Sequence, residues 1–149
     1  MALIDYLNKE RTTIDILKDW RNQEWRREHA SDVVRDANDR MLALRGQNLS
    51  TTPVQGGGNS REELLCNLID KKTVAERGRQ AAEEYFAELL PAWNCLSEDE
   101  RWMLTVRFVD KEYDGGGIRA IMARYHIEKT KAYDMSNAAL QHLARLLFW

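Results

Sequence analysis

Proline is rare in this chain of 149 residues, which contains only two, and long apolar runs are missing altogether. A helix that crosses a bilayer needs about 20 consecutive apolar residues, and no segment approaches that length. The N-terminal sequence MALIDYLNKERTTIDIL places Asp5 and Glu10 where a secretory signal requires an uninterrupted apolar core. These absences argue against secretion and against a membrane partner, and we expect a cytoplasmic protein.

Cysteine is nearly absent as well, since Cys66 and Cys95 are the only two. Both lie among apolar neighbours in segments with helical periodicity. Two cysteines without a secretion signal provide no disulfide framework, so we interpret them as buried free thiols. The histidines lack the spacing of metal ligands, both among themselves and relative to the cysteines. We therefore expect neither a structural metal nor a cofactor.

A strong excess of one charge is also missing, because 22 basic and 24 acidic residues leave a net charge of −2. The charged residues are distributed unevenly along the chain. From Gly116 to the end, five basic residues (Arg119, Arg124, Lys129, Lys131 and Arg145) accompany only Glu128 and Asp134, which leaves a net charge of +3. A local basic face is the electrostatic feature that nucleic-acid binding requires, and the last segment has a modest one.

Helical periodicity dominates the sequence, and no segment alternates with the period of two that a strand shows. We predict an all-α fold in which residues 1–45 form one long helix or a helical hairpin. A heptad-like apolar stripe in this segment comprises Ala30, Val34, Ala37, Met41 and Leu44. It is out of phase with an earlier stripe across RNQEWRREH, which predicts a bend or a change of partner there. So narrow a stripe needs another helix or another copy of the chain, and we predict that it makes the protein a homo-oligomer.

A break follows at residues 46–60, GQNLSTTPVQGGGNS, which we interpret as a flexible Gly-rich linker. The glycines lack the Gly-Lys-Ser/Thr ending of a phosphate loop. Ser60 and Glu63 have the spacing of a capping box, so we predict a connecting helix over residues 61–90 that ends at Pro91.

Residues 91–149 have the pattern of a separate helical domain. Ser97 and Glu100 form a second capping box before EDERWMLTVRFVD, and DGGG ends that region. A short helix over residues 118–124, a corner at Tyr125-His126-Ile127 and a helix from Glu128 follow. The last helix is predicted to bury Ala132, Met135, Ala139 and Leu143. This layout is typical of a trihelical helix-turn-helix, although an ordinary corner between packed helices gives the same spacing.

The segments LSEDERWMLTVRFVD and IRAIMARYHIEKTKAYDMSNAALQHL resemble region four of the bacterial sigma-70 factors. The resemblance covers residues 96–149. The wider arrangement, including TTPVQGGGNSREELLCNLIDKK, resembles phage and prophage regulators of the ArpU and RinA type. The resemblance implies a DNA-binding transcription regulator in a bacterial host, with double-stranded DNA as partner and host RNA polymerase as a further one. Met122 and His126 depart from the pattern, because the family has a small residue and a glycine at those positions.

The resemblance also implies which residues contact DNA. The base-contacting positions correspond to Lys129, Thr130, Tyr133 and Asp134, at the start of the last helix. Lys129 would donate to guanine, Thr130 would contact a thymine methyl group and Asp134 would accept from cytosine. Lys131, Arg124 and Arg119 would neutralise phosphates. Tyr133 is open to two interpretations, a base contact or packing on Arg124.

Two other functions fit parts of the sequence. A small terminase subunit, which packages phage DNA, also combines a helix-turn-helix with an oligomerising helix. A helical adaptor that binds protein would explain the net negative charge and could use the apolar end LARLLFW. Enzymatic activity is not expected, because the acidic residues of the connecting helix alternate with lysine and arginine and no serine, cysteine or histidine has a partner for a relay.

Overall fold

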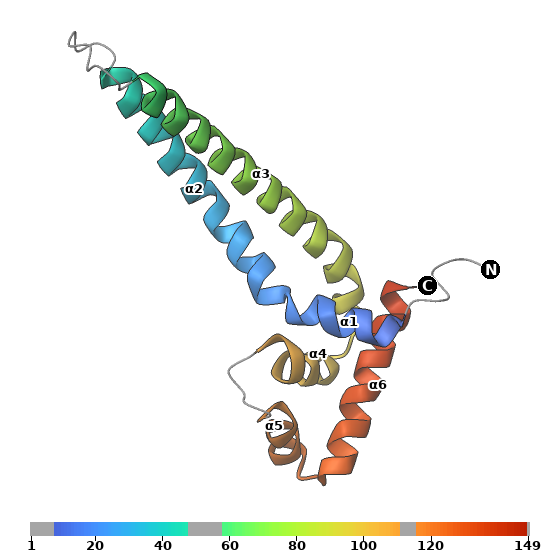
Figure 1. Cartoon of the computed structure of the whole chain (residues 1–149). Coiled ribbons are helices and arrows are strands. Elements are labelled where there is room, and N and C mark those ends of the chain that lie inside the picture. The colour runs from blue at the N-terminus through green and yellow to red at the C-terminus, as the bar shows by residue number, and fades with distance from the viewer. Residues whose placement is uncertain (1–7, 48–57, 111–115, 149) are drawn as a thin grey trace. The chain divides into compact units, whose positions relative to one another are not determined.

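The computed structural model describes residues 8–47, 58–110 and 116–148, and these residues are helical without a strand, which confirms the all-α fold class (Figure 1). The elements are α1 (Lys9–Lys18), α2 (Trp20–Gln47), α3 (Gly58–Asn94), α4 (Glu98–Leu104), the π-helical turn η2 (Thr105–Val109), α5 (Gly116–Tyr125) and α6 (Lys129–Leu147). The chain forms two compact units. We call residues 1–23 with 85–149 the core unit, and residues 24–84 the hairpin unit.

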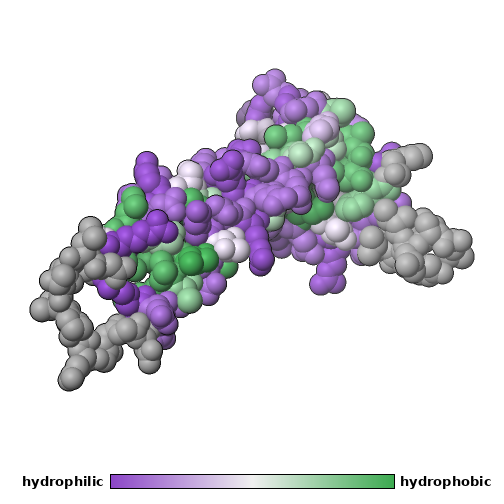
Figure 2. Space-filling view, turned by 90° about the horizontal axis from the view of Figure 1, so that it is seen from above, coloured by the Kyte–Doolittle hydropathy of each residue, from purple (hydrophilic) through white to green (hydrophobic). Residues whose placement is uncertain are grey.

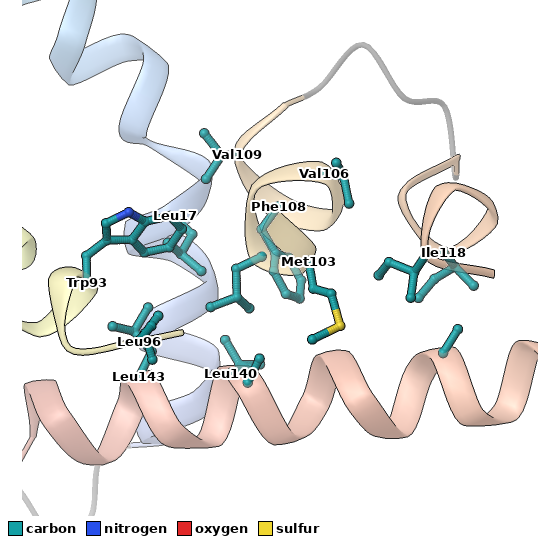
Figure 3. Packing of buried hydrophobic residues seen from close by; sticks show 14 of the residues in the cluster. Leu17, Trp93, Leu96, Met103, Val106, Phe108, Val109, Ile118, Leu140 and Leu143 are labelled. Carbon is teal, nitrogen blue, oxygen red and sulfur yellow. The ribbon is translucent and has the colours of Figure 1, made fainter. Parts of the chain in front are cut away.

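The core unit is built around large apolar side chains from helices that are distant in sequence. Leu17 of α1, Leu104 of α4, Ile121 of α5 and Leu143 of α6 are each 0% exposed. Figure 3 shows side chains from α1, the end of α3, α4 with η2, and α6 converging in one cluster. Helix α1 packs against both α6 and η2. The last helix is therefore held by a core to which the N-terminal part of the chain contributes.

Aromatic and polar contacts join the start of the chain to this core. The ring of Trp20 lies 4.9 Å from Trp93 and 5.6 Å from Phe86, in edge-to-face arrangements. The hydroxyl of Tyr85 donates a hydrogen bond to the carbonyl of Ile16. Arg21 donates to the carboxylate of Asp110 at 2.6 Å, directly after η2. These contacts differ from the sequence prediction, which separated residues 1–45 from a domain at 91–149.

The hairpin unit consists of the long part of α2 and the first part of α3, which run antiparallel side by side (Figure 1). Ala30 and Ala37 are buried, and Val34, Met41 and Leu44 are partly buried. Arg61 of α3 donates to the carbonyl of Leu44 at 3.1 Å. The predicted stripe on α2 therefore has a partner within the same chain, α3, and its requirement for a second copy disappears. Oligomerisation through this stripe stays a prediction.

Several element boundaries differ from the sequence prediction. Helix α2 continues through Gln47 and α3 begins at Gly58, so the predicted linker at 46–60 is shorter, and residues 48–57 lie outside the described chain. Ser60 lies inside the first turn of α3 instead of capping it. Helix α3 also continues through Pro91 to Asn94. The capping box at Ser97 is confirmed, with Glu100 N–H donating to Ser97 Oγ at 3.2 Å and Ser97 N–H to Glu100 Oε1 at 3.1 Å.

The cysteine interpretation was wrong in one respect, because Cys66 and Cys95 are free thiols but both are exposed. Helical periodicity alone did not separate these two positions from the buried ones. None of the described helices is long and apolar enough to cross a membrane.

Candidate nucleic-acid interface

The turn between α5 and α6 is short and depends on His126. This residue has φ 52°, a left-handed conformation, and it stands where the family that the sequence resembles has a glycine. Histidine adopts this conformation more readily than most non-glycine residues. The N–H of Ile127 donates to the Met122 carbonyl at 3.2 Å, and Glu128 is the N-cap of α6. The chain therefore turns sharply and presents the first turn of α6 at the surface.

Helix α5 lies very close to η2, and Gly117 makes this possible. A Cβ atom at Gly117 would lie 2.5 Å from the Val106 carbonyl oxygen and 2.6 Å from the Arg107 Cα. Backbone cannot move away as a flexible side chain can, so any larger residue would displace α5. The sequence predicted that this glycine belongs to a break at DGGG, whereas Gly116 and Gly117 lie in the first turn of α5.

Arg107 fastens α6 to η2. Its guanidinium donates to Ser136 Oγ at 2.8 Å and to Asn137 Oδ1 at 2.6 Å. It also lies 5.1 Å from the centre of the Tyr133 ring. Burial lowers the pKa of Arg107, and Tyr133 opposes that shift. This role was not predicted from the sequence, although an arginine between the buried residues Val106 and Phe108 is the signal that could have revealed it.

Tyr133 is 38% exposed and packs beside Arg107, not on Arg124 as one interpretation expected. Ser136 is fully buried one turn later and donates to the Ala132 carbonyl at 2.9 Å. The buried face of α6 includes the predicted Ala132, Ala139 and Leu143, whereas the predicted Met135 is only partly buried. A buried serine was not predicted, because the partners that satisfy its hydroxyl become visible only in the folded chain.

Arg124 is directed toward α4. Its guanidinium lies 4.2 Å from the centre of the Trp102 ring, and its Nη2 lies 3.8 Å from the carboxylate of Asp99. The hydroxyl of Tyr125 donates to the same carboxylate at 2.8 Å, and burial together with Asp99 raises the pKa of Tyr125. Arg124 is still 44% exposed. A phosphate contact by this arginine would compete with Asp99.

The other predicted DNA contacts lie on exposed surface. Lys129, Thr130, Lys131 and Asp134 are exposed on the first two turns of α6, and Arg119 is exposed on α5. Lys129 and Lys131 form no ion pair with any residue that the structure describes. The N-cap residue Glu128 makes no side-chain capping hydrogen bond within the described chain, and the first turn of α6 contains no acidic residue. The backbone N–H groups in the first turn of α6 and the side chains of Lys129 and Lys131 can therefore bind an anion.

A second polar link holds α6 to α4 farther along. His142 Nδ1 lies 2.7 Å from Glu100 Oε2, and Glu100 also accepts from Ser97. Burial raises the pKa of Glu100, but the hydrogen bonds from His142 and Ser97 outweigh burial and lower it overall. Together with Arg107, this pair fixes α6 at two points along its length.

Among the described residues, no group of three or more His, Cys, Asp or Glu side chains is arranged to hold a metal ion. Comparisons with protein-family models, with curated proteins and with solved structures each found no match for this chain.

Proposed function

We propose that the chain binds double-stranded DNA through α5 and α6, with the start of α6 in the major groove, and regulates transcription of phage or prophage genes. One observation supports this proposal above the others. Lys129, Thr130 and Lys131 are consecutive and exposed at the start of α6, where Glu128 makes no side-chain capping hydrogen bond within the described chain. Neither lysine has an ion-pair partner among the described residues. The regulatory role and the phage context come from the resemblance to sigma region four and to the phage regulators.

Electrostatics favour an anion at this helix end. The free N–H groups of the first turn place partial positive charge there, and anions at helix N-termini are a recurrent consequence. The lysines add two full charges to the same turn. Lys131 suits a phosphate contact, because its flexible stem carries a point charge that tolerates many positions of the oxygen atoms.

Base contacts would come from two neighbouring pairs on the same helix surface. Tyr133 lies four positions after Lys129, and Asp134 lies four positions after Thr130, so each pair lies on one face of the helix. Lys129 has donors for guanine O6 and N7, and the Asp134 carboxylate has acceptors for cytosine N4. Asp99 and Asp134 reduce the positive field nearby, so a single copy would bind weakly and two copies would bind with greater avidity.

Selection of bound sequences from random duplex DNA, with the full-length protein, tests the proposal. We expect a preferred site, and Lys129→Ala should weaken binding to it by about 1–3 kcal/mol while binding to unrelated duplexes changes much less. Asp134→Asn should change the preferred base at one position, because the side chain gains a donor. Absence of binding at low salt by the folded protein would contradict the proposal.

A protein-binding adaptor is the second candidate, and a groove in the core unit favours it. This groove has a volume of about 620 Å³ and lies between α1, the end of α3 and the end of α6. Its lining is mainly apolar and includes Ile16, Leu89, Pro91 and Leu146, with Glu88 as the charged residue. Two results together would support the adaptor instead. The folded protein would bind no DNA, and Leu146→Asp would abolish its binding to a protein partner.

A further inference from the structure

One side of the hairpin unit has a groove that runs along both helices. Near the end of α2 it has a volume of about 610 Å³ and is lined by Met41, Leu42, Ile69, Lys72, Thr73 and Glu76 among others. It continues into a second hollow of about 360 Å³ that shares Asn38 and Glu76 with the first and extends to Ala30 and Arg79. The two hollows therefore form one groove along the unit.

The hairpin unit lacks the burial that a stable pair of long helices needs. Among its described residues, only the alanines Ala30, Ala37 and Ala82 are buried. Leu42 is 62% exposed and Ile69 is 47% exposed, and both border the groove. Figure 2 shows apolar residues at the surface of the hairpin where α2 ends and α3 begins. Long amphipathic helices obtain most of their stability from packing an apolar face against another element. We therefore expect further helices to pack into this groove.

The charges on the groove wall suit a second copy of the same chain. Lys72 and Glu76 are one helical turn apart on α3, both border the groove, and neither forms an ion pair with a described residue. A two-fold axis that passes near residue 74 and pairs the two α3 helices antiparallel places Lys72 of each copy opposite Glu76 of the other. A two-fold axis parallel to the helices would instead pair each residue with the same residue of the other copy. Arg45 and Lys72 of both copies would then lie at the same height along the bundle, and their positive charges would repel.

We propose that two copies of this chain pair through this groove as an antiparallel four-helix bundle, with Leu42 and Ile69 in its interior and Lys72 facing Glu76 across the two-fold axis. The contact is isologous, since the same surface is used by both copies. Ala30, Val34 and Met41 of the α2 stripe predicted from the sequence also line this groove, but the pairing adds residues of α3 and the exposed Leu42 to the contact. The inference does not rest on DNA binding and is tested without DNA.

Charge reversal with mixing tests the pairing. Sedimentation analysis of the full-length protein should give a dimer. Lys72→Glu and Glu76→Lys should each raise the dimer dissociation constant about tenfold or more, because two attractive pairs become repulsive. A mixture of the two variants should recover the wild-type constant, because the first variant carries two carboxylates at these positions and the second carries two amines, so both pairs attract again. A defect in folding of the separate chains cannot produce this recovery.

Lys71→Glu is the matched control, because it makes the same change of charge on an exposed residue of α3 that does not line the groove. It should leave the dissociation constant within about twofold. Ile69→Asp combined with Leu42→Asp should give a helical monomer by circular dichroism and sedimentation. A wild-type monomer at the highest soluble concentration, a ring of many copies, or reversal variants that fail to recover on mixing would each overturn the proposal.

Discussion

The core unit and the hairpin unit are both helical, but different interactions hold them. In the core unit, fully buried leucine and isoleucine side chains come from α1, α4, α5 and α6, and two tryptophans pack edge to face. In the hairpin unit, the buried residues among those described are alanines. Because the free energy of apolar burial grows with the area removed from water, most of it belongs to the core unit. The candidate interface thus belongs to the part of the chain with the larger core.

The polar contacts differ in the same way. Those of the core unit join residues distant in sequence, as Arg107 does with Ser136 and Glu100 with His142. In the hairpin unit the exposed ion pairs of Arg35 with Asp32 and of Arg79 with Glu83 join neighbours on one helix, and Arg61 with the Leu44 carbonyl is a contact between its two helices. Exposed pairs of this kind contribute little to stability. Long-range links position a surface, whereas local pairs only support helix formation.

The largest contrast should appear when a leucine is shortened in each unit. Leu17→Ala should reduce the free energy of unfolding by about 2–5 kcal/mol, because the side chain is fully buried and leaves a cavity. Leu42→Ala removes the same atoms from an exposed position and should change it by about 0.5 kcal/mol or less in the monomer. Urea titration followed by circular dichroism measures both. A loss at Leu17 of about 0.5 kcal/mol or less would contradict the place of α1 in the core.

A smaller effect should follow removal of the Arg107 side chain. Arg107→Ala leaves Ser136 and Asn137 without their donor and should destabilise the protein by about 1–3 kcal/mol. Arg145→Ala removes an exposed arginine from α6 and serves as the control. Thermal unfolding compares the two. If Arg107→Ala unfolds at the temperature of the control, these hydrogen bonds do not fasten α6.

The smallest effect should be the pH dependence of the Glu100 link. The folded state lowers the pKa of Glu100, so its contribution is present above the ordinary value of 4.5 and is lost as the pH falls through the lower folded value. The free energy of unfolding should therefore decline by at most about 1 kcal/mol over that interval because of this group. Glu100→Gln should remove that part of the decline. An identical pH profile for both proteins would argue that the pair is not formed.

Much of the fold follows from local patterns in the sequence. The helical periodicity and the capping box at Ser97 each depend on neighbouring residues, and both were predictable. The left-handed conformation of His126 was suggested only by the glycine that the resembled family has at this position. The assignment of α1 to the core unit was not, because its apolar stripe would suit any partner. Whether the α2 stripe packs in the same chain likewise depends on α3, which follows a break whose path the sequence does not specify.

The candidate site was predictable in part for the same reason. Exposure of Lys129, Thr130 and Lys131 follows from their place opposite the apolar face of α6. The partners of Arg124 and Tyr133 required the tertiary structure, because Asp99, Trp102 and Arg107 lie on α4 and η2. Sequence spacing identifies a helix face, but it does not show which side chains from other helices reach it.

Salt dependence of DNA binding tests the central claim most directly. Binding of wild-type protein, Lys131→Ala and Arg145→Ala to one duplex should be measured over a range of salt concentrations. Lys131→Ala should lower the slope of log affinity against log salt by about one unit, because one phosphate contact is lost. Arg145→Ala removes the same charge from the last turn of α6 and should leave the slope unchanged. Equal slopes for all three proteins, or no binding at low salt, would contradict a DNA-binding surface at the start of α6.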